Sequence, residues 1–352
     1  MFNTVEDVTK RFGEYGYIAD KRIATAAFLA DRLEKPLLVE GPAGCGKTEL
    51  GKVLAMAMGS ELIRLQCYEG LDEAKALYEW AYPKQLLYTQ ILRDKIGELL
   101  TGTSTLGEAV ARIAGQEDAF FSEQFLLQRP LLRALRSERR VVLLIDEVDR
   151  AEAEFEAFLL EVLSDFQVSI PELGTLRARH IPLVILTSNN AREMTDALKR
   201  RCLYLHVGFP DAEREQAIVR ARLPEAPDKL TAEVVRVVQA LRKLDLKKRP
   251  SVSETLEWVR ALVVLNVETL DRGLAESTLN VVLKYEGDIE RAEEKLGELF
   301  VRHRGLVPNR DVKWRRITIR WDGATFAIEQ REGWIAAKRA RADMQPEIGR
   351  AH

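Results

Sequence analysis

The sequence predicts an α/β fold built around a parallel β-sheet, and three apolar runs carry this prediction. Residues 37–39, 141–145 and 183–186 are short, continuously hydrophobic and rich in branched side chains, which is typical of strands that are covered on both faces. A helical pattern follows the first run at residues 49–58, and polar residues end the other two. Ligands bind at the carboxyl ends of parallel strands, so these strand ends hold the candidate functional residues.

The first strand leads into a glycine-rich loop with the spacing G-x-x-x-x-G-K-T. In a strand–loop–helix context this spacing predicts a loop that binds the phosphates of a nucleoside triphosphate. Glycines let backbone N–H groups point inward, and the next helix adds the positive end of its dipole. Lys47 can reach the β- and γ-phosphates, and the Thr48 hydroxyl can bind Mg²⁺. The candidate nucleotide-binding residues here are Gly41, Pro42, Ala43, Gly44, Cys45, Gly46, Lys47, Thr48 and Glu49.

Two acids, Asp146 and Glu147, end the second strand. Asp146 is suited to hold Mg²⁺ through its water shell, so the candidate metal ligands are Thr48 and Asp146, and Glu147 is suited to polarise the attacking water as a general base. The third strand ends in Thr-Ser-Asn-Asn, where the amide of Asn189 could orient that water. A plain strand end with a solvated cap is the alternative, and the phosphate loop elsewhere in the chain favours the catalytic interpretation.

Length, composition and charge narrow the class of protein. The chain of 352 residues allows two or three domains, and its 46% hydrophobic and 31% charged residues are ordinary for a soluble globular protein. A net charge of −2 gives no general attraction to nucleic acid or anionic membranes. No apolar run approaches the roughly 20 residues of a membrane helix, and the N-terminus lacks a secretory pattern. We therefore expect a cytoplasmic protein.

The three cysteines, Cys45, Cys67 and Cys202, are widely spaced and indicate neither a disulfide framework nor a metal site. Cys45 lies at the start of a predicted helix, where the pKa of a thiol tends to fall. Two interpretations stay open: a thiol whose oxidation blocks the nucleotide, or a small side chain that fills space.

Residues 3–32 predict an amphipathic helical lead-in with a break near Gly16. In that break, Tyr17 and Ile18 could pack against a purine ring or simply fill the core, and both alternatives stay open.

A further strand is predicted at residues 61–67, between the phosphate loop and the apolar run at 141–145. The interval from 68 to 140 is too long for one crossover. Helical patterns at 72–80 and 125–135 indicate an insertion there. After the acids, residues 155–166 predict an amphipathic helix, and 167–176 predict a β-hairpin that turns at Pro-Glu-Leu-Gly.

Read in order, the phosphate loop, Asp146-Glu147, Asn189 and Arg200-Arg201 resemble the AAA+ ATPases, and more narrowly the MoxR family and its CoxD-like subgroup. Four stretches carry the narrower likeness, which covers residues 15–285: FLLQRPLLRAL, VVLLIDEVDRAEAEFEAFLLEVLSDFQVSIPELGTLRA, LVILTSNNAREMTDALKRRCLYL and RPSVSETLEW. The resemblance implies an AAA+ P-loop NTPase domain with a five-stranded parallel sheet, a small helical lid, and a typically hexameric ring with ATP at the subunit interfaces.

The same resemblance assigns roles to particular residues. Asn189 becomes the sensor-1 residue, and Arg201 or its neighbour Arg200 becomes the finger that reaches the γ-phosphate of the adjacent subunit, worth about 10³–10⁵ in rate. Solvated charges at a helix end are the alternative for this pair. The resemblance also implies that the insertion near residues 71–80 and the hairpin near 166–178 face the ring pore or a substrate, and a structural brace is equally open.

Residues 208–211 predict a domain boundary, and helical patterns at 211–223, 231–244, 253–270 and 276–285 fit a small four-helix lid. Related lids place a sensor-2 arginine at the start of the third helix, where this chain has Ser253. Arg249 is the best substitute for a contact with phosphate; alternatively, the segment PSVSE only caps the helix.

A helix at residues 289–301 and a hairpin around Asp322-Gly323 are predicted near the C-terminus. Residues 302–341 contain eleven Lys or Arg against four Asp or Glu. This surplus could bind nucleic acid, dock an acidic partner or the next subunit, or belong to a solvated tail.

We thus expect an AAA+ α/β nucleotide-binding domain at residues 1–209, an all-α lid at 210–286 and a short α+β extension at 287–352. The resemblance implies a Mg²⁺-dependent ATPase ring that remodels protein clients, such as metalloenzymes that need activation or cofactor insertion, with a von Willebrand factor A domain partner. A nucleic-acid-stimulated motor or loader that uses the basic C-terminal segment is the alternative. Glu147 argues against a third class, a scaffold that binds ATP without turnover.

Overall fold

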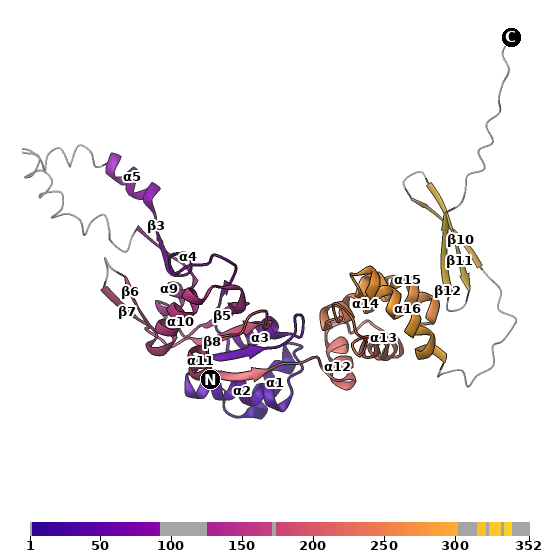
Figure 1. Ribbon diagram of the computed structural model, residues 1–352, viewed down its shortest axis with the longest axis horizontal. Coiled ribbons are helices and arrows are strands. Elements are labelled where there is room, and N and C mark those ends of the chain that lie inside the picture. The colour runs from indigo at the N-terminus through magenta and orange to yellow at the C-terminus, as the bar shows by residue number, and fades with distance from the viewer. Residues whose placement is uncertain are drawn as a thin grey trace, which may run out of the picture. The chain divides into compact units, whose positions relative to one another are not determined.

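A computed structural model describes residues 2–91, 125–170 and 174–301, and three C-terminal strands at 315–321, 324–331 and 334–339. The chain divides into two units, Met1–Phe209 and Pro210–His352, whose elements are labelled in Figure 1. No helix in the described part of the chain is long and apolar enough to cross a membrane.

The first unit is built on a five-stranded sheet with the strand order β2-β5-β8-β1-β9. All of its pairings are parallel. The strands are β1 (Leu37–Glu40), β2 (Leu62–Gln66), β5 (Val142–Asp146), β8 (Leu183–Ser188) and β9 (Leu203–His206). The three central strands are buried along their whole length, whereas the edge strand β2 alternates between buried and exposed residues. The structure therefore confirms the α/β fold with a five-stranded parallel sheet.

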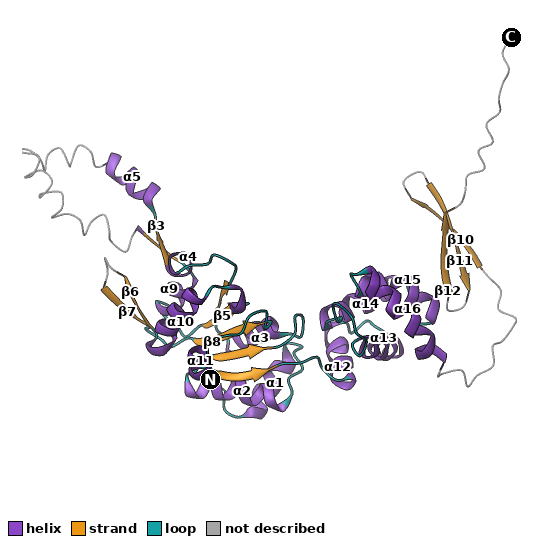
Figure 2. Cartoon of the chain, viewed as in Figure 1, coloured by secondary structure: helices purple, strands orange, loops and turns teal. Residues whose placement is uncertain are grey.

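Helices cover both faces of this sheet, as Figure 2 shows. Their bounds are α1 (Val5–Glu14), α2 (Lys21–Leu33), α3 (Lys47–Met58), α9 (Pro130–Leu135), α10 (Ala153–Asp165) and α11 (Asp196–Arg201). Alternate residues of β5 serve the two faces: Leu143 and Ile145 pack in a cluster with α9 and α10, and Val142 and Leu144 pack in a cluster with α1, α2 and α3. The unbroken apolar run of β5 thus follows from burial on both sides.

Only part of the predicted insertion is helical. Helix α4 ends at Leu77 (Glu73–Leu77), and residues Tyr78–Trp80 form β3, which pairs antiparallel with β4 (Leu126–Gln128). The predicted helices at 72–80 and 125–135 were therefore wrong at their β3 and β4 ends, because pairing with a segment distant in sequence overrides local periodicity. Helix α5 (Tyr82–Ile91) follows β3, and residues 92–124 of the long interval lie outside the described residues.

The predicted hairpin after α10 is present. Strand β6 (Gln167–Ile170) pairs antiparallel with β7 (Gly174–Arg177), with Gln167 opposite Arg177. The first three residues of its predicted turn, 171–173, lie outside the described residues.

The second unit contains a helical bundle around a single hydrophobic cluster that includes the fully buried Trp258. The helices are α12 (Ala212–Arg222), α13 (Asp228–Leu241), α14 (Val252–Val264), α15 (Arg272–Val282) and α16 (Glu286–Val301). The predicted helix at 253–270 was too long, since Asn266 adopts a left-handed φ of 54° just beyond α14. Asp271 then caps α15 by accepting a hydrogen bond from the Leu274 N–H.

Three antiparallel strands lie near the C-terminus, in the order β10 (Arg315–Trp321), β11 (Ala324–Arg331) and β12 (Trp334–Arg339). The predicted hairpin is confirmed by the pairing of Trp321 with Ala324, although its turn, Asp322-Gly323, lies outside the described residues. Strand β12 was not predicted. Of the basic segment 302–341, only the paths of these three strands are described.

Candidate nucleotide-binding site

The glycine-rich loop connects β1 to α3 and depends on two glycines. Gly41 has a φ of 155°, and a Cβ there would lie 1.9 Å from the carbonyl oxygen of Val207, so only glycine fits. Gly46 has a φ of 94° and precedes α3, and no side chain among the described residues caps that helix. The first turn of α3 therefore presents backbone N–H groups and a positive dipole end, which suit an anionic ligand.

The Lys47 side chain reaches from α3 to the end of β8. Its ammonium donates hydrogen bonds to the carbonyl oxygens of Gly41 and Pro42, both at 2.7 Å, and to Oδ1 of Asn189 at 2.8 Å. Lys47 is only 6% exposed, and this burial lowers its pKa, against the opposing effect of Cys45 and nearby acids. Because these two carbonyl groups belong to the phosphate loop itself, the oxygens of a bound phosphate could take their place as acceptors for the Lys47 ammonium.

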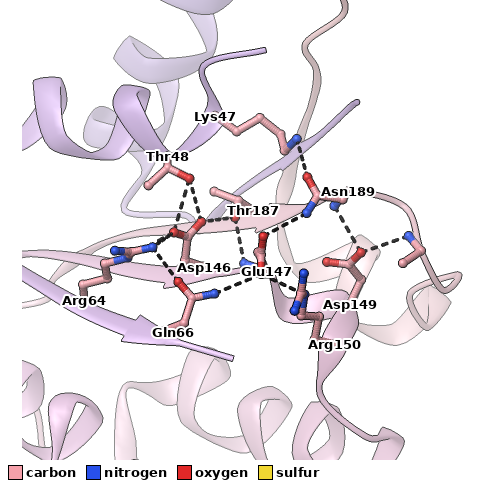
Figure 3. A network of polar contacts seen from close by, with 11 residues as sticks. Lys47, Thr48, Arg64, Gln66, Asp146, Glu147, Asp149, Arg150, Thr187 and Asn189 are labelled. Atoms are coloured by element: carbon pink, nitrogen blue, oxygen red, sulfur yellow. Dashed lines mark hydrogen bonds and ion pairs between the residues drawn. The ribbon is translucent and has the colours of Figure 1, made fainter. Parts of the chain in front are cut away.

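The carboxylate of Asp146 accepts hydrogen bonds from several side chains, and the residue as a whole is 1% exposed. It accepts hydrogen bonds from the hydroxyls of Thr48 (2.9 Å) and Thr187 (2.5 Å) and from Nε of Arg64 (3.0 Å). Figure 3 shows these contacts. The structure thus brings the two candidate metal ligands, Thr48 and Asp146, into direct contact, and both present the oxygen atoms that Mg²⁺ prefers.

Glu147 lies beside Asp146 in a left-handed conformation with a φ of 55°. Such a conformation is costly for a residue with a side chain and is found preferentially at functional sites. The Glu147 N–H donates to the Thr187 hydroxyl at 2.9 Å. Its carboxylate accepts hydrogen bonds from Asn189 (3.2 Å) and Gln66 (3.1 Å) and pairs with Arg150 at 2.8 Å.

Asp149 holds the loop that carries Asn189. It is 4% exposed, and its Oδ2 accepts the backbone N–H groups of Asn189 at 3.2 Å and Ala191 at 2.9 Å. These two bonds fix the backbone on both sides of Asn190, whose φ is 61°. Asp149 therefore positions the Asn189 amide between Lys47 and Glu147.

Our sequence analysis did not single out five residues of this network: Arg64, Gln66, Asp149, Arg150 and Thr187. One signal was present, because alternate residues of the predicted strand 61–67 share a face, and Arg64 and Gln66 are two apart. The register that pairs Gln66 with Asp146 was not readable from the sequence.

The paired arginines are placed differently. Arg200 and Arg201 are both exposed at the end of α11. Arg201 donates to the Ser164 hydroxyl at 2.6 Å and to the Ala197 carbonyl at 3.4 Å. Within the described residues, no hydrogen bond or ion pair joins either arginine to the network in Figure 3.

The remaining candidates lie around the loop or in the second unit. Tyr17 is buried, packs edge-on against Phe12 at 5.7 Å between ring centroids and lies 3.8 Å from where a Cβ on Gly46 would be. Tyr17 is therefore buried beside the phosphate loop, a position compatible with both alternatives. Ile18 is half-buried, and Glu49 pairs with Lys52 at 2.6 Å.

Cys45 does not have the lowered pKa considered from its helix position. Burial raises the pKa of its thiol, against the effect of Lys47, and its Sγ donates to the Val207 carbonyl at 3.1 Å. These contacts favour the other interpretation, a side chain that fills space under the loop, and whether oxidation of Cys45 blocks the nucleotide stays a prediction.

Arg249 is exposed just before α14. The neighbouring segment forms a helix cap, as one alternative predicted: Ser251 and Glu254 make a reciprocal capping box. The cap accounts for PSVSE and leaves the role of Arg249 as a prediction.

Comparisons with known proteins show what this domain is similar to. Residues 37–210 match the model of the ATPase family associated with various cellular activities (AAA). An uncharacterized protein of Staphylococcus haemolyticus is 24% identical over 70% of this chain and 83% of its own length. An uncharacterized protein of Staphylococcus aureus (strain bovine RF122 / ET3-1) is 25% identical over 66% of this chain and 77% of its own length.

Among solved structures, the RuvB Holliday junction branch migration motor of Thermotoga maritima is 13% identical, with a TM-score of 0.41 over 74% of this chain and 67% of that chain. None of these matches distinguishes the MoxR family or its CoxD-like subgroup. The family match begins at the first residue of β1 and ends shortly after β9, so it spans the whole parallel sheet, and this part of the chain is similar to the AAA family of ATPases.

Proposed function

We propose that this domain hydrolyses ATP with Mg²⁺, using Lys47, Asn189 and Glu147 at the γ-phosphate. One observation carries the proposal: a continuous chain of hydrogen bonds joins the three side chains. Lys47 donates to Asn189 Oδ1 at 2.8 Å, and Asn189 Nδ2 donates to Glu147 Oε1 at 3.2 Å. The group that would bind the phosphate and the group that would take a proton from water are therefore held in one network.

Each residue has a distinct task in this proposal. The loop N–H groups and Lys47 bind the phosphates, and the Asn189 amide orients the attacking water between Lys47 and Glu147. Mg²⁺, when bound, would neutralise charge on the β- and γ-phosphate oxygens. The Thr48 hydroxyl and the Asp146 carboxylate are the oxygen ligands that would hold it.

Glu147 is the general base in this proposal. Oε1 of its carboxylate accepts a hydrogen bond from Asn189, and Oε2 is engaged by Gln66 and Arg150. A carboxylate has about four lone-pair sites, so these three donors leave one that can accept a proton from water.

The proposal extends to assembly. Arg200 and Arg201 are exposed, so they are available to a second copy of the chain rather than to their own site. We infer that copies assemble in a ring, as a hexamer, with one arginine completing the neighbour's ATP site. In that ring Arg249 contacts phosphate in place of a sensor-2 arginine, and Tyr17 and Ile18 border the adenine.

The biological role rests on the MoxR and CoxD-like resemblance alone. It makes the ring a chaperone-like remodeller that activates a metalloenzyme or inserts its cofactor, with a von Willebrand factor A domain partner. The basic composition of residues 302–341 favours one alternative, a nucleic-acid-stimulated motor. DNA- or RNA-stimulated turnover that falls steeply with salt would select that alternative.

The variant Glu147→Gln tests the ATPase proposal. It keeps the size and the hydrogen-bonding capacity of the side chain but cannot accept the proton, so we expect ATP binding as in the wild type and turnover lower by about 10²–10⁴. Glu138→Gln is a matched control, because Glu138 pairs with Arg179 at the surface. Turnover that survives in Glu147→Gln would show that Glu147 is not the base. The same ATP-trapped variant, used in a pull-down, reports whether a von Willebrand factor A domain protein is bound.

A further inference from the structure

In this structure the Asp146 carboxylate, which we assign to Mg²⁺, is paired with the guanidinium of Arg64. Arg64 extends from β2 and donates to Oδ2 of Asp146 from Nε at 3.0 Å and from Nη2 at 2.5 Å. The Asp146 carboxylate also accepts hydrogen bonds from the hydroxyls of Thr48 and Thr187. Figure 3 shows the guanidinium lying directly against this carboxylate.

The pairing answers a physical need of the metal-free domain. The Asp146 side chain is 2% exposed, and a buried carboxylate without a counter-charge is strongly destabilising. Arg64 supplies that charge. A hydrated Mg²⁺ held by Asp146 needs the same oxygen atoms, and two cations at one carboxylate oxygen repel each other.

The Arg64 side chain also has room to move away from Asp146. Its side chain is 46% exposed, so a change of rotamer costs little burial. It lines a cavity of about 1120 Å³ whose lining also includes Glu73 and two ion pairs, Asp72 with Lys75 and Glu79 with Arg129. All of these residues belong to the first unit.

We propose that Arg64 is an internal counter-cation that competes with Mg²⁺ for Asp146 and is displaced into this cavity when metal and nucleotide bind. The domain would then need more Mg²⁺ to load nucleotide than its oxygen ligands alone require. This inference rests on the proposed ATP site, and it makes Arg64 a positioning residue that acts through Asp146.

Nucleotide binding by the full chain tests the competition without relying on turnover. Fluorescent ADP is titrated in EDTA, and Mg²⁺ is then titrated at fixed ADP to find the midpoint of its effect on binding. In Arg64→Gln we expect the Mg²⁺ midpoint to fall by about tenfold and metal-free ADP binding to weaken by about threefold, because the uncovered charge of Asp146 attracts the metal and repels phosphate. A merely structural role would weaken both affinities together.

Two further variants complete the test. Arg64→Lys keeps the charge but loses the forked contact, so its midpoint should lie between those of the wild type and Arg64→Gln, and it decides the outcome if Arg64→Gln does not fold. Arg133→Gln, whose residue pairs with Glu61, should behave as the wild type. A midpoint that is unchanged or raised in Arg64→Gln would overturn the inference alone, whereas a wild type that binds no ADP with Mg²⁺ would overturn the proposed function beneath it.

Discussion

The phosphate-side cluster, which we define as Lys47, Asp146, Glu147 and Asn189, differs sharply from the arginine pair Arg200 and Arg201. The cluster is interconnected through hydrogen bonds among residues of α3 and of the carboxyl ends of two strands, β5 and β8, of the same chain. The arginine pair is exposed at the end of α11, and no hydrogen bond within the described part of the chain joins it to the cluster. A single chain therefore builds the phosphate half of the candidate site, and the arginines are available to a neighbouring copy.

If the arginines of one copy complete the site of another, removing them should lower ATP turnover more than any other substitution proposed here. We expect Arg201→Ala, Arg200→Ala or both to lower the turnover of the assembled protein by about 10³–10⁵, because the charge that develops on the γ-phosphate loses its partner. ATP binding should stay near the wild-type value. Steady-state hydrolysis and equilibrium binding measure the two effects separately.

Lys199→Ala is the control for this experiment, since Lys199 lies on the same helix and pairs with the exposed Glu193 at 3.5 Å. Full turnover in both arginine variants would remove the arginine half from the site and leave the cluster to act alone.

Asp149→Ala should have an intermediate effect, within the phosphate-side half. The variant leaves the N–H groups of Asn189 and Ala191 without their buried acceptor, and an unsatisfied donor of this kind costs about 1–3 kcal/mol. We expect kcat to fall by about tenfold while KM for ATP changes little, because Asn189 loses its position but the phosphate loop is intact. A larger change in KM than in kcat would mean that Asp149 supports binding instead.

Much of the phosphate-side half was predictable because its signals are local. The loop spacing, the apolar run of β5 and the acids that end it are contiguous in sequence, and contiguous patterns reveal strands and their ends. Arg64 and Gln66 escaped prediction, since their partners lie on another strand and depend on the register between β2 and β5. The β3–β4 pairing escaped for the same reason.

Cys45→Ala should have the smallest effect, because the thiol only fills space beneath the loop. We expect ATP affinity to change by less than about threefold. Burial raises the pKa of Cys45, and it raises the pKa of Cys67 and of Cys202 to about 12. Thiol reagents at pH 8 should therefore react slowly with the native protein and quickly with the unfolded chain. Rapid loss of ATP binding on thiol modification of the native protein would contradict this account.

The raised thiol pKa values also determine the direction in which the free energy of unfolding changes with pH. A thiol that stays protonated in the folded state stabilises the protein fully below about pH 9. That contribution to the free energy of unfolding is lost as the pH rises from there toward about 12. If burial raises the pKa of Cys67, the free energies of unfolding of the wild type and of Cys67→Ala should converge as the pH rises across this range. Denaturant titrations at each pH measure them.

The central claim, that one chain holds the phosphate half and lends its arginines to another, is tested most directly by mixing two inactive variants. Glu147→Gln keeps both arginines, and the double variant Arg200→Ala, Arg201→Ala keeps the acid. Our account predicts that ATP turnover reappears on mixing and assembly, because Glu147 of one copy meets the intact arginines of the other. Two variants that are each inactive and remain inactive in mixed assemblies would contradict it.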